Sequence, residues 1–291
     1  MIKYYSFKEV DKSKLNGKGL IIKKHQFLYS SLNKKIKYYI DNKTEKEYIN
    51  YFDRVFFEII KTDYKPDAKK YDFFACHIYK KDNDDKDIDI TDSDISKELR
   101  NSKTLTIDDS NSYNTDHLKI VYAERGFAFI AKKFKEQADM FEKNYILYLL
   151  AHAYNLYSEK LMKEISDYYE KGNDDEILKV RKEIYIFDLN CFFVNPVYNK
   201  NHQIHNLWTY LEKIYKVEQN HNQMKYQVKD LVNLIEMDLK DNENKRASRR
   251  TAILGIIGLM ITTLSIGSVY ADLVGLGVPN IFKTEIIKAD K

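Results

Sequence analysis

Seven residues near the carboxyl end of the chain are spaced so that they could line a path for ions. Their intervals of 4, 3, 4, 3, 4 and 3 residues keep them on one face of a helix that coils gently around its neighbours. They are Thr251, Gly255, Gly258, Thr262, Ser265, Val269 and Asp272. Several copies of this face around a wet axis would make a pore lined by hydroxyl groups, with an acidic ring at Asp272. Close helix packing also uses small and hydroxyl-bearing residues, so both interpretations stay open.

The remaining candidate groups favour a binding or structural role over catalysis. His202 and His205 share a helix face, but the pattern places no third metal ligand beside them. His152 falls in an apolar stripe, where a hydrogen-bonded core histidine is expected. The acidic run 82–94 lacks the central glycine and terminal glutamate of an EF-hand, so we predict a solvated loop. Because no phosphate-binding loop, Ser-His-Asp or Cys-His signature occurs, the sequence does not predict an enzyme.

The segment that carries the polar face has the composition of a membrane span. Residues 251–271 contain no charged side chain, and a bilayer core of about 30 Å needs roughly 20 helical residues. Five of the nine glycines fall between residues 255 and 277, and membrane helices tolerate glycine better than soluble helices do. The sequence therefore predicts a transmembrane helix over 251–272, followed by a short tail over 273–291.

Charged residues on the two sides of this segment predict its orientation. Lys245, Arg246, Arg249 and Arg250 precede it as a basic membrane-interface group, and fewer cations follow it. This asymmetry places the N-terminal 250 residues in the cytoplasm and the chain in a bacterial inner membrane. The two cysteines are far apart and expected to be unpaired, as a reducing compartment requires. With 48 basic and 44 acidic residues, the surface lacks the basic stripe of a nucleic-acid-binding protein, and no nucleic-acid partner is expected.

The second half of the chain is predicted to be mostly helical. No glycine or proline interrupts the chain between Pro196 and Gly255, and apolar residues recur there close to every 3.5 residues. We therefore expect one very long stalk helix that begins after Asn201, its N-cap, and continues into the membrane. A second helix covers 141–168, and a third runs from Asp174 to about residue 193. These two should pack antiparallel to each other against the start of the stalk.

Residues 1–130 have the composition of a mixed α/β domain. Runs rich in β-branched and aromatic residues predict strands over 19–22, 73–79 and 118–122. The run 126–130 is either another strand or the turn that enters the stalk. Residues 48–61 have helical periodicity, so a helix is expected there.

This architecture resembles the CorA family of magnesium channels over nearly the whole chain. At the level of single residues the resemblance covers only 249–272, where Ile266-Gly267-Ser268-Val269-Tyr270 is similar to the end of the family's first membrane helix. Ala271-Asp272-Leu273 stands where the family has Gly-Met-Asn, and the apolar run after it is too short for a second membrane helix. The resemblance implies a homopentamer whose first membrane helices line the pore. It implies a divalent cation such as magnesium as a candidate cofactor, but not magnesium selectivity.

The sequence thus predicts an α+β membrane protein in four parts: a cytoplasmic α/β domain (1–130), a helical stalk domain (131–250), a transmembrane helix (251–272) and a tail (273–291). The leading hypothesis is an oligomeric CorA-like inner-membrane ion channel or pore, gated by a cation, small molecule or nucleotide bound to the cytoplasmic domain. Its pore-lining residues would be Thr251, Gly255, Gly258, Thr262, Ser265 and Asp272. Two alternatives stay open. One is a membrane effector of a nucleotide-signalled antiviral (type III CRISPR) system, as resemblance to CorA-like proteins without the signature implies; the other is a non-conducting, membrane-anchored scaffold.

Overall fold

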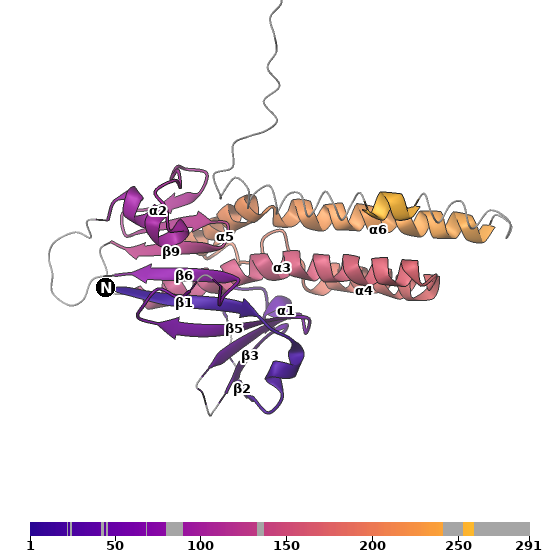
Figure 1. Cartoon of the computed structure of the whole chain (residues 1–291), viewed down its shortest axis with the longest axis horizontal. Helices are drawn as coiled ribbons and strands as arrows, with labels where there is room; N and C mark the ends of the chain where they lie inside the picture. The colour runs from indigo at the N-terminus through magenta and orange to yellow at the C-terminus, as the bar shows by residue number, and fades with distance from the viewer. Residues whose placement is uncertain are drawn as a thin grey trace, which may run out of the picture. The chain divides into compact units, whose positions relative to one another are not determined.

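Nine strands in the described part of the chain form one mixed sheet, and long helices follow it (Figure 1). The computed structural model describes residues 1–21, 23, 25–41, 44, 46–67, 69–79, 90–132, 137–240 and 253–258. The strands are β1 Ile2–Glu9, β2 Gly19–Ile21, β3 Ile36–Ile40, β4 Glu47–Tyr51, β5 Val55–Thr62, β6 Phe73–Ile78, β7 Ser112–Asn114, β8 Leu118–Ala123 and β9 Gly126–Ala131. The helices are the 3-10 helix η1 Lys12–Leu15, α1 Ser30–Asn33, α2 Asp92–Arg100, α3 Ala138–Glu170, α4 Asp174–Asn190, α5 His202–Tyr215 and α6 Val217–Lys240, and residues 253–258 are also helical.

The predicted order of a sheet region followed by helices is confirmed, and so are the three predicted strand runs, as β2, β6 and β8. The run 126–130, for which a strand and a turn were both open, is the strand β9. Contacts between residues divide the chain into two compact units, Met1–Val232 and Asn233–Lys291. The first unit contains the whole sheet and the helices α1 to α5. Among the residues that the structure describes, no helix is long and apolar enough to cross a bilayer. Of the predicted span 251–272, only residues 253–258 are described.

The strand order is β2-β3-β4-β5-β1-β6-β9-β8-β7, with β1 in the middle of the sheet. Every neighbouring pair is antiparallel except β6 and β9, which run parallel with Cys76 opposite Ala128. Parallel neighbours need a crossover connection, and the chain between β6 and β9 supplies it with α2, β7 and β8. The N-terminal strand therefore joins an antiparallel half of the sheet to a mixed half.

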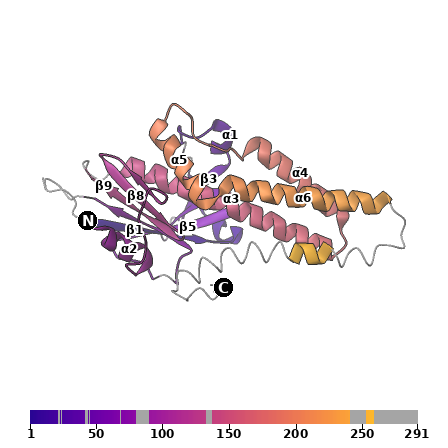
Figure 2. The same cartoon turned by 90° about the horizontal axis from the view of Figure 1, so that it is seen from above.

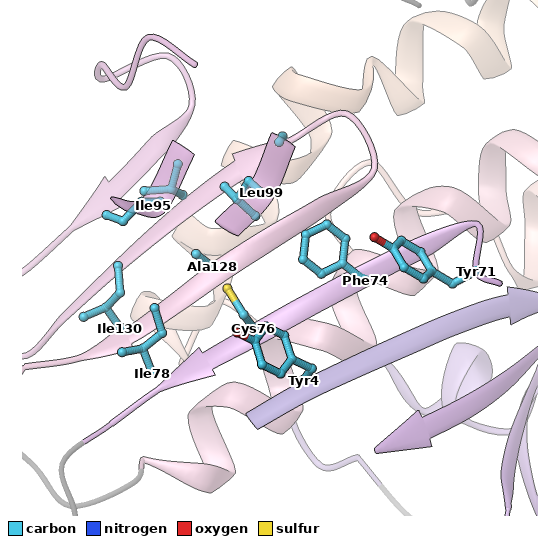
Figure 3. Packing of buried hydrophobic residues seen from close by; sticks show 11 residues of the cluster. Tyr4, Tyr71, Phe74, Cys76, Ile78, Ile95, Leu99, Ala128 and Ile130 are labelled. Atoms are coloured by element: carbon cyan, nitrogen blue, oxygen red, sulfur yellow. The ribbon is translucent and has the colours of Figure 1, made fainter. Parts of the chain in front are cut away.

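Alternating side chains of the central strands pack against helices on opposite faces of the sheet. In β1, the Tyr5 ring centre lies 4.6 Å from that of Phe141, and the Phe7 ring centre 5.8 Å from that of Tyr145, both on α3. Tyr4 points to the other face, where α2 closes an apolar cluster (Figure 3). Besides Tyr4, the cluster contains Tyr71, Phe74, Cys76, Ile78, Ile95, Leu99, Val121, Ala123, Ala128 and Ile130. The strands near β1 and β6 are thus buried between the α2 cluster on one face and α3 on the other.

The end of the acidic run is a helix start, so the predicted loop is wrong there. Thr91 Oγ1 accepts a hydrogen bond from the Asp94 amide, and the Asp94 carboxylate accepts one from the Thr91 amide, both at 3.2 Å. This reciprocal capping box, with acidic residues in the first turn, stabilises the N-terminus of α2. Residues 82–89 of the run lie outside the described residues.

The helix expected over 48–61 is wrong, because this segment forms the antiparallel pair β4 and β5. Its apolar residues are buried on both faces of the sheet, for example Ile49 and Val55 on one face and Tyr48 and Phe56 on the other. A strand buried on both faces has no alternation, so its periodicity cannot be told from that of a buried helix. The turn between the strands contains two residues with left-handed backbone, Phe52 and Asp53, each with φ of 61°.

The predicted antiparallel helices are confirmed as α3 and α4, which contact each other and run next to each other in Figure 1. In the view from above, the first part of α6 is drawn between them (Figure 2). The turn between them contains Gly172 with φ of 66°, as a helix C-terminus favours. The single stalk helix is wrong, because α5 ends at Tyr215 and α6 begins at Val217. Lys216 between them has φ of 50°.

Tertiary hydrogen bonds explain the break in the stalk, since no glycine or proline causes it. The Tyr215 hydroxyl donates to the Ala123 carbonyl in β8 at 2.9 Å, which fixes the end of α5 to the sheet. The Asn155 amide of α3 donates to the Tyr215 carbonyl at 3.1 Å, an acceptor that the ended helix leaves free. The bend therefore depends on residues far away in the sequence.

Replacing Gly126 by alanine should lower the free energy of unfolding by about 1–3 kcal/mol, the usual cost of overpacking a core. A Cβ atom at Gly126 would lie 2.6 Å from the Phe74 carbonyl oxygen and 2.7 Å from the Phe74 ring, so β6 and β9 would have to separate. Urea-induced unfolding followed by circular dichroism would measure the change. Without a clash, a glycine-to-alanine change usually raises stability, because alanine lowers the conformational entropy of the unfolded chain. A urea midpoint equal to or higher than that of the unchanged protein would therefore contradict the close contact between Gly126 and Phe74.

Candidate functional site

Most residues of the predicted pore face lie outside the part of the chain that the structure describes. Gly255 and Gly258 are the exceptions, and both belong to the short helical segment 253–258. The others are Thr251, Thr262, Ser265 and Asp272, and the basic group Lys245, Arg246, Arg249 and Arg250 lies outside the described residues as well. The pore face therefore stays a prediction from the sequence.

The structure instead brings together residues from three distant segments around an open cleft of about 700 Å³. We call it the α3–α5 cleft. The loop after β2, the first turns of α3 and the two residues before α5 form its wall: Lys23, His25, Gln26, Phe27, Asp139, Glu142, Lys143, Ile146, Lys200 and Asn201. A volume of this size lies within the range of small-molecule sites, about 300–1,000 Å³.

Backbone hydrogen bonds hold the loop after β2 to the segment that precedes α5. Leu28 and Val197 form an antiparallel bridge, and the Tyr198 amide donates to the Phe27 carbonyl at 2.9 Å. The Tyr29 amide donates to the Pro196 carbonyl at 3.0 Å. The loop after β2 and the segment before α5 are both fixed to this bridge. This part of the cleft wall and the start of α5 therefore form one connected structure.

The charges of the cleft leave one cation in excess. The carboxylates of Asp139 and Glu142 are paired with Lys143 and Lys23, the second pair at 3.5 Å. Lys200 has no carboxylate partner among the described residues, and its ammonium group lies 5.5 Å from the centre of the Tyr198 ring. An exposed ammonium held over an aromatic ring keeps most of its capacity to bind an anion.

His25 presents a buried imidazole to the cleft, with 8% of its surface exposed. Burial, together with the charge of Lys23, lowers the pKa of His25 to about 4, so the ring is neutral at pH 7. Its Nε2 is 2.5 Å from the Tyr38 hydroxyl, which is itself buried. A buried hydroxyl without an acceptor costs free energy, so Tyr38 donates to Nε2 and the ring proton resides on Nδ1. Nδ1 is therefore a donor with no partner among the described residues.

Asn201 adds a second unused donor. It is the N-cap residue of α5, as predicted, but its side chain makes no capping hydrogen bond. Its Nδ2 is buried and has no partner in the described part of the chain. The first turn of α5 also contains no acidic residue that would neutralise its free amides.

A second junction joins the sheet to the α3–α4 pair. The left-handed turn between β4 and β5 inserts Phe52 between the two helices, with its ring centre 5.2 Å from Tyr154 on α3 and 5.0 Å from Phe187 on α4. Two residues later, Arg54 donates to Glu164 on α3 at 2.6 Å and to both oxygens of Glu183 on α4 at 2.8 and 2.6 Å. The turn therefore fixes both helices to the ends of the interior strands β4 and β5 through apolar and charged contacts.

A buried histidine fixes α4 to α6. The His221 ring on α6 stacks on Phe192 with ring centres 3.7 Å apart, and its Nε2 is 2.6 Å from the Asp188 carboxylate on α4. Lys225 pairs with the other oxygen of Asp188 at 2.5 Å. Burial would raise the pKa of Asp188, but these two hydrogen bonds outweigh it and lower the pKa. The sheet, α3, α4 and the first part of α6 are thus joined by successive specific contacts.

The sequence predicted the surroundings of the other histidines and of the cysteines with different success. His152 is in the core as expected, but its Nε2 has no hydrogen-bond partner among the described residues, so the expected hydrogen bond is wrong for this atom. His202 and His205 do not take part in any cluster of three or more metal-ligating side chains in the described ranges. Cys76 and Cys191 are free and buried, which confirms that they are unpaired.

Sequence reasoning missed the cleft because no local motif marks it. The only signal was the position of Asn201 as an N-cap next to Lys200, since His25 and Lys143 belong to other segments. Comparison of the chain with protein-family models, with curated proteins and with solved structures finds no match.

Proposed function

We propose that the chain is one subunit of an oligomeric, CorA-like ion channel or pore in the bacterial inner membrane, whose cytoplasmic α+β domain binds a ligand and biases the pore between closed and open states. The observation that carries the proposal is the uncharged segment 251–271 with its seven-residue repeat of small and hydroxyl-bearing side chains. A single anchor helix needs only apolar length, whereas helices packed in an oligomer, with or without a wet path between them, also need a small and polar face. The homopentamer comes from the resemblance alone.

The contacts within the first unit support a gating role for the α+β domain. The α3–α5 cleft contains the N-cap of α5, and α5 ends where Tyr215 is bonded to the sheet and α6 begins. Ten residues then separate the end of α6 from Thr251. A ligand that changes the position of α5 relative to the sheet would change the direction in which α6 leaves the bend at Lys216. A ligand acts in this way only by its different affinity for the two arrangements.

Replacing Thr262 by valine should lower cation flux several-fold, and replacing Asp272 by asparagine should lower it further, because each removes oxygen ligands from the proposed path. The full chain would be reconstituted in liposomes and flux followed with an ion-sensitive dye. Thr263 offers a matched control, because it is adjacent to Thr262 but off the seven-residue repeat. Thr263→Val should conduct like the unchanged protein.

Equal flux for the unchanged protein and for the Thr262 and Asp272 variants, with the same subunit count, would contradict the pore. Absence of flux from a correctly inserted oligomer under every condition tested would favour the non-conducting scaffold, which the single predicted span also suits.

A further inference from the structure

We propose that the α3–α5 cleft binds a small molecule that carries a phosphoryl group, with the phosphoryl oxygens between Lys200, Asn201 and His25. Binding itself is independent of the proposed channel; only the effect of the ligand on ion flux rests on that function.

The donors of the cleft fit an oxyanion with several acceptor atoms. Lys200 supplies a charge that no described carboxylate neutralises, and Asn201 Nδ2 and His25 Nδ1 are hydrogen-bond donors without partners in the described residues. A phosphate monoester carries a charge of about −1.5 to −2 at pH 7 and has three strong acceptor oxygens, so it can satisfy all three groups at once. A single carboxylate has only two oxygens and about one half to two thirds of that charge.

The size and lining of the cleft indicate that the ligand is larger than inorganic phosphate. About 700 Å³ is far more than a phosphate ion fills, and Phe27 and Ile146 add apolar surface to a mostly polar wall. The paired carboxylates of Asp139 and Glu142 offer acceptors to hydroxyl or amino groups on the rest of the molecule. These features predict an organic phosphate with polar groups at its far end.

The phosphoryl group would contact the start of α5 directly, because Asn201 is the N-cap residue of that helix. Anions are stabilised at helix N-termini by free amides and by the helix dipole. Since His25 and Lys200 lie on the two segments that the Leu28–Val197 bridge joins, an occupied cleft would hold that bridge closed. The ligand would thereby stabilise one position of α5 relative to the sheet.

The test uses the full chain in detergent, with pyrophosphate as the probe and calorimetric titration as the measurement. Pyrophosphate should bind at one site per chain, and Lys200→Ala should weaken binding about tenfold or more, the expected loss of one charge-assisted hydrogen bond. Asn201→Asp, which has the same shape but loses the donor and adds negative charge, should weaken it further. Lys213→Ala removes an equal charge from the exposed end of the same helix, outside the cleft, and should bind like the unchanged protein.

Three results would overturn the proposal: no binding of pyrophosphate, equal loss for the Lys200 and Lys213 variants, or equally tight binding of citrate. Vesicles that contain phosphatidate, compared with neutral vesicles, test whether the phosphoryl group comes from a lipid. Binding to these vesicles through Lys200 in preference to pyrophosphate would overturn the small-molecule assignment.

Ion flux in liposomes separates the proposed binding site from the proposed channel. Pyrophosphate that binds but leaves flux unchanged contradicts gating by the cleft, whereas flux absent in all conditions contradicts the channel and leaves the binding site intact.

Discussion

Phe52→Ala is expected to lower the free energy of unfolding by about 3–5 kcal/mol, the usual cost of removing a buried aromatic ring. The ring is 8% exposed and contacts Tyr154, Tyr157 and Phe187, so its loss leaves a cavity between α3 and α4 next to the turn that joins β4 and β5. Chemical unfolding monitored by circular dichroism would measure the change. The same variant should loosen the α3–α4 pair from the sheet, which faster amide hydrogen exchange in α4 would show.

Glycine at position 52 tests whether the left-handed backbone there costs free energy. Phe52 has φ of 61°, a conformation that costs residues with a Cβ roughly 1–2 kcal/mol. Alanine keeps this cost and glycine does not, so Phe52→Gly should be more stable than Phe52→Ala by about 1 kcal/mol, although glycine is normally the worse residue in a folded chain.

The exposed Tyr64 serves as the matched control for loss of an aromatic ring, since 74% of its surface is accessible. Tyr64→Ala should change stability by less than about 0.5 kcal/mol. If Phe52→Ala cost no more than this control, the ring would not join the sheet to the helices as described. If glycine were less stable than alanine, the left-handed turn would be contradicted.

The left-handed backbone at Phe52 shows that the connection between the sheet and the helices costs conformational free energy. A turn of this kind usually carries asparagine or glycine at its two central positions, which favour left-handed backbone. Here phenylalanine and aspartate occupy them, and the compensation comes from the helices: the ring packs between Tyr154 and Phe187, while Arg54 bonds Glu164 and Glu183. Residues that hold strain of this kind persist only when their surroundings fix them. The gating that we propose for this domain would require such a rigid connection from the sheet to the helices.

Local patterns predicted the elements that depend on local chemistry. Gly172 ends α3 because glycine adopts the left-handed conformation of a helix C-terminus, and the acidic residues after it begin α4. The strands β6 and β8 could be predicted because their β-branched and aromatic runs are bounded by turn residues. These signals lie within a few residues of the feature that they specify.

The wrong predictions concern features that depend on distant residues. The break at Lys216 needs the Ala123 carbonyl and the Asn155 side chain as partners for Tyr215, and nothing in the stalk sequence indicates either. The α3–α5 cleft also depends on residues that are distant from one another in the sequence. Lys23 and Lys143 are each paired with a carboxylate, whereas Lys200 has no such partner within the described ranges, a difference that appears only after folding. The sequence therefore predicted the kinds of elements better than it predicted the site they form.

Acidification should destabilise the protein between about pH 6.5 and pH 3 through the buried His152. Burial lowers the pKa of His152 from its ordinary 6.5 to about 3. In this window the unfolded chain binds a proton that the folded chain does not, so stability is complete above pH 6.5 and falls as the pH decreases. The slope is about 1.4 kcal/mol per pH unit for one histidine. His25, with its pKa lowered to about 4, adds a similar slope over the upper part of the window.

His152→Phe isolates this contribution. The imidazole stacks on Phe73 with ring centres 3.9 Å apart, and Tyr148 and Tyr215 lie at 4.6 and 4.5 Å. Burial raises the pKa of both tyrosines, so they stay neutral throughout the window and do not contribute to the slope. Because Nε2 has no partner among the described residues, an apolar ring should be tolerated at pH 7 at a cost below about 1.5 kcal/mol.

Unfolding curves of the unchanged protein and the variant, measured from pH 7 to pH 4, give the comparison. His152→Phe should reduce the slope by about 1.4 kcal/mol per pH unit. Equal slopes for the unchanged protein and the His152 variant would mean that this histidine is protonated as readily in the folded protein as in the unfolded chain. The packing of α3 on the sheet around Phe73 would then have to be open to water, which is the opposite of a rigid connection between the sheet and the helices.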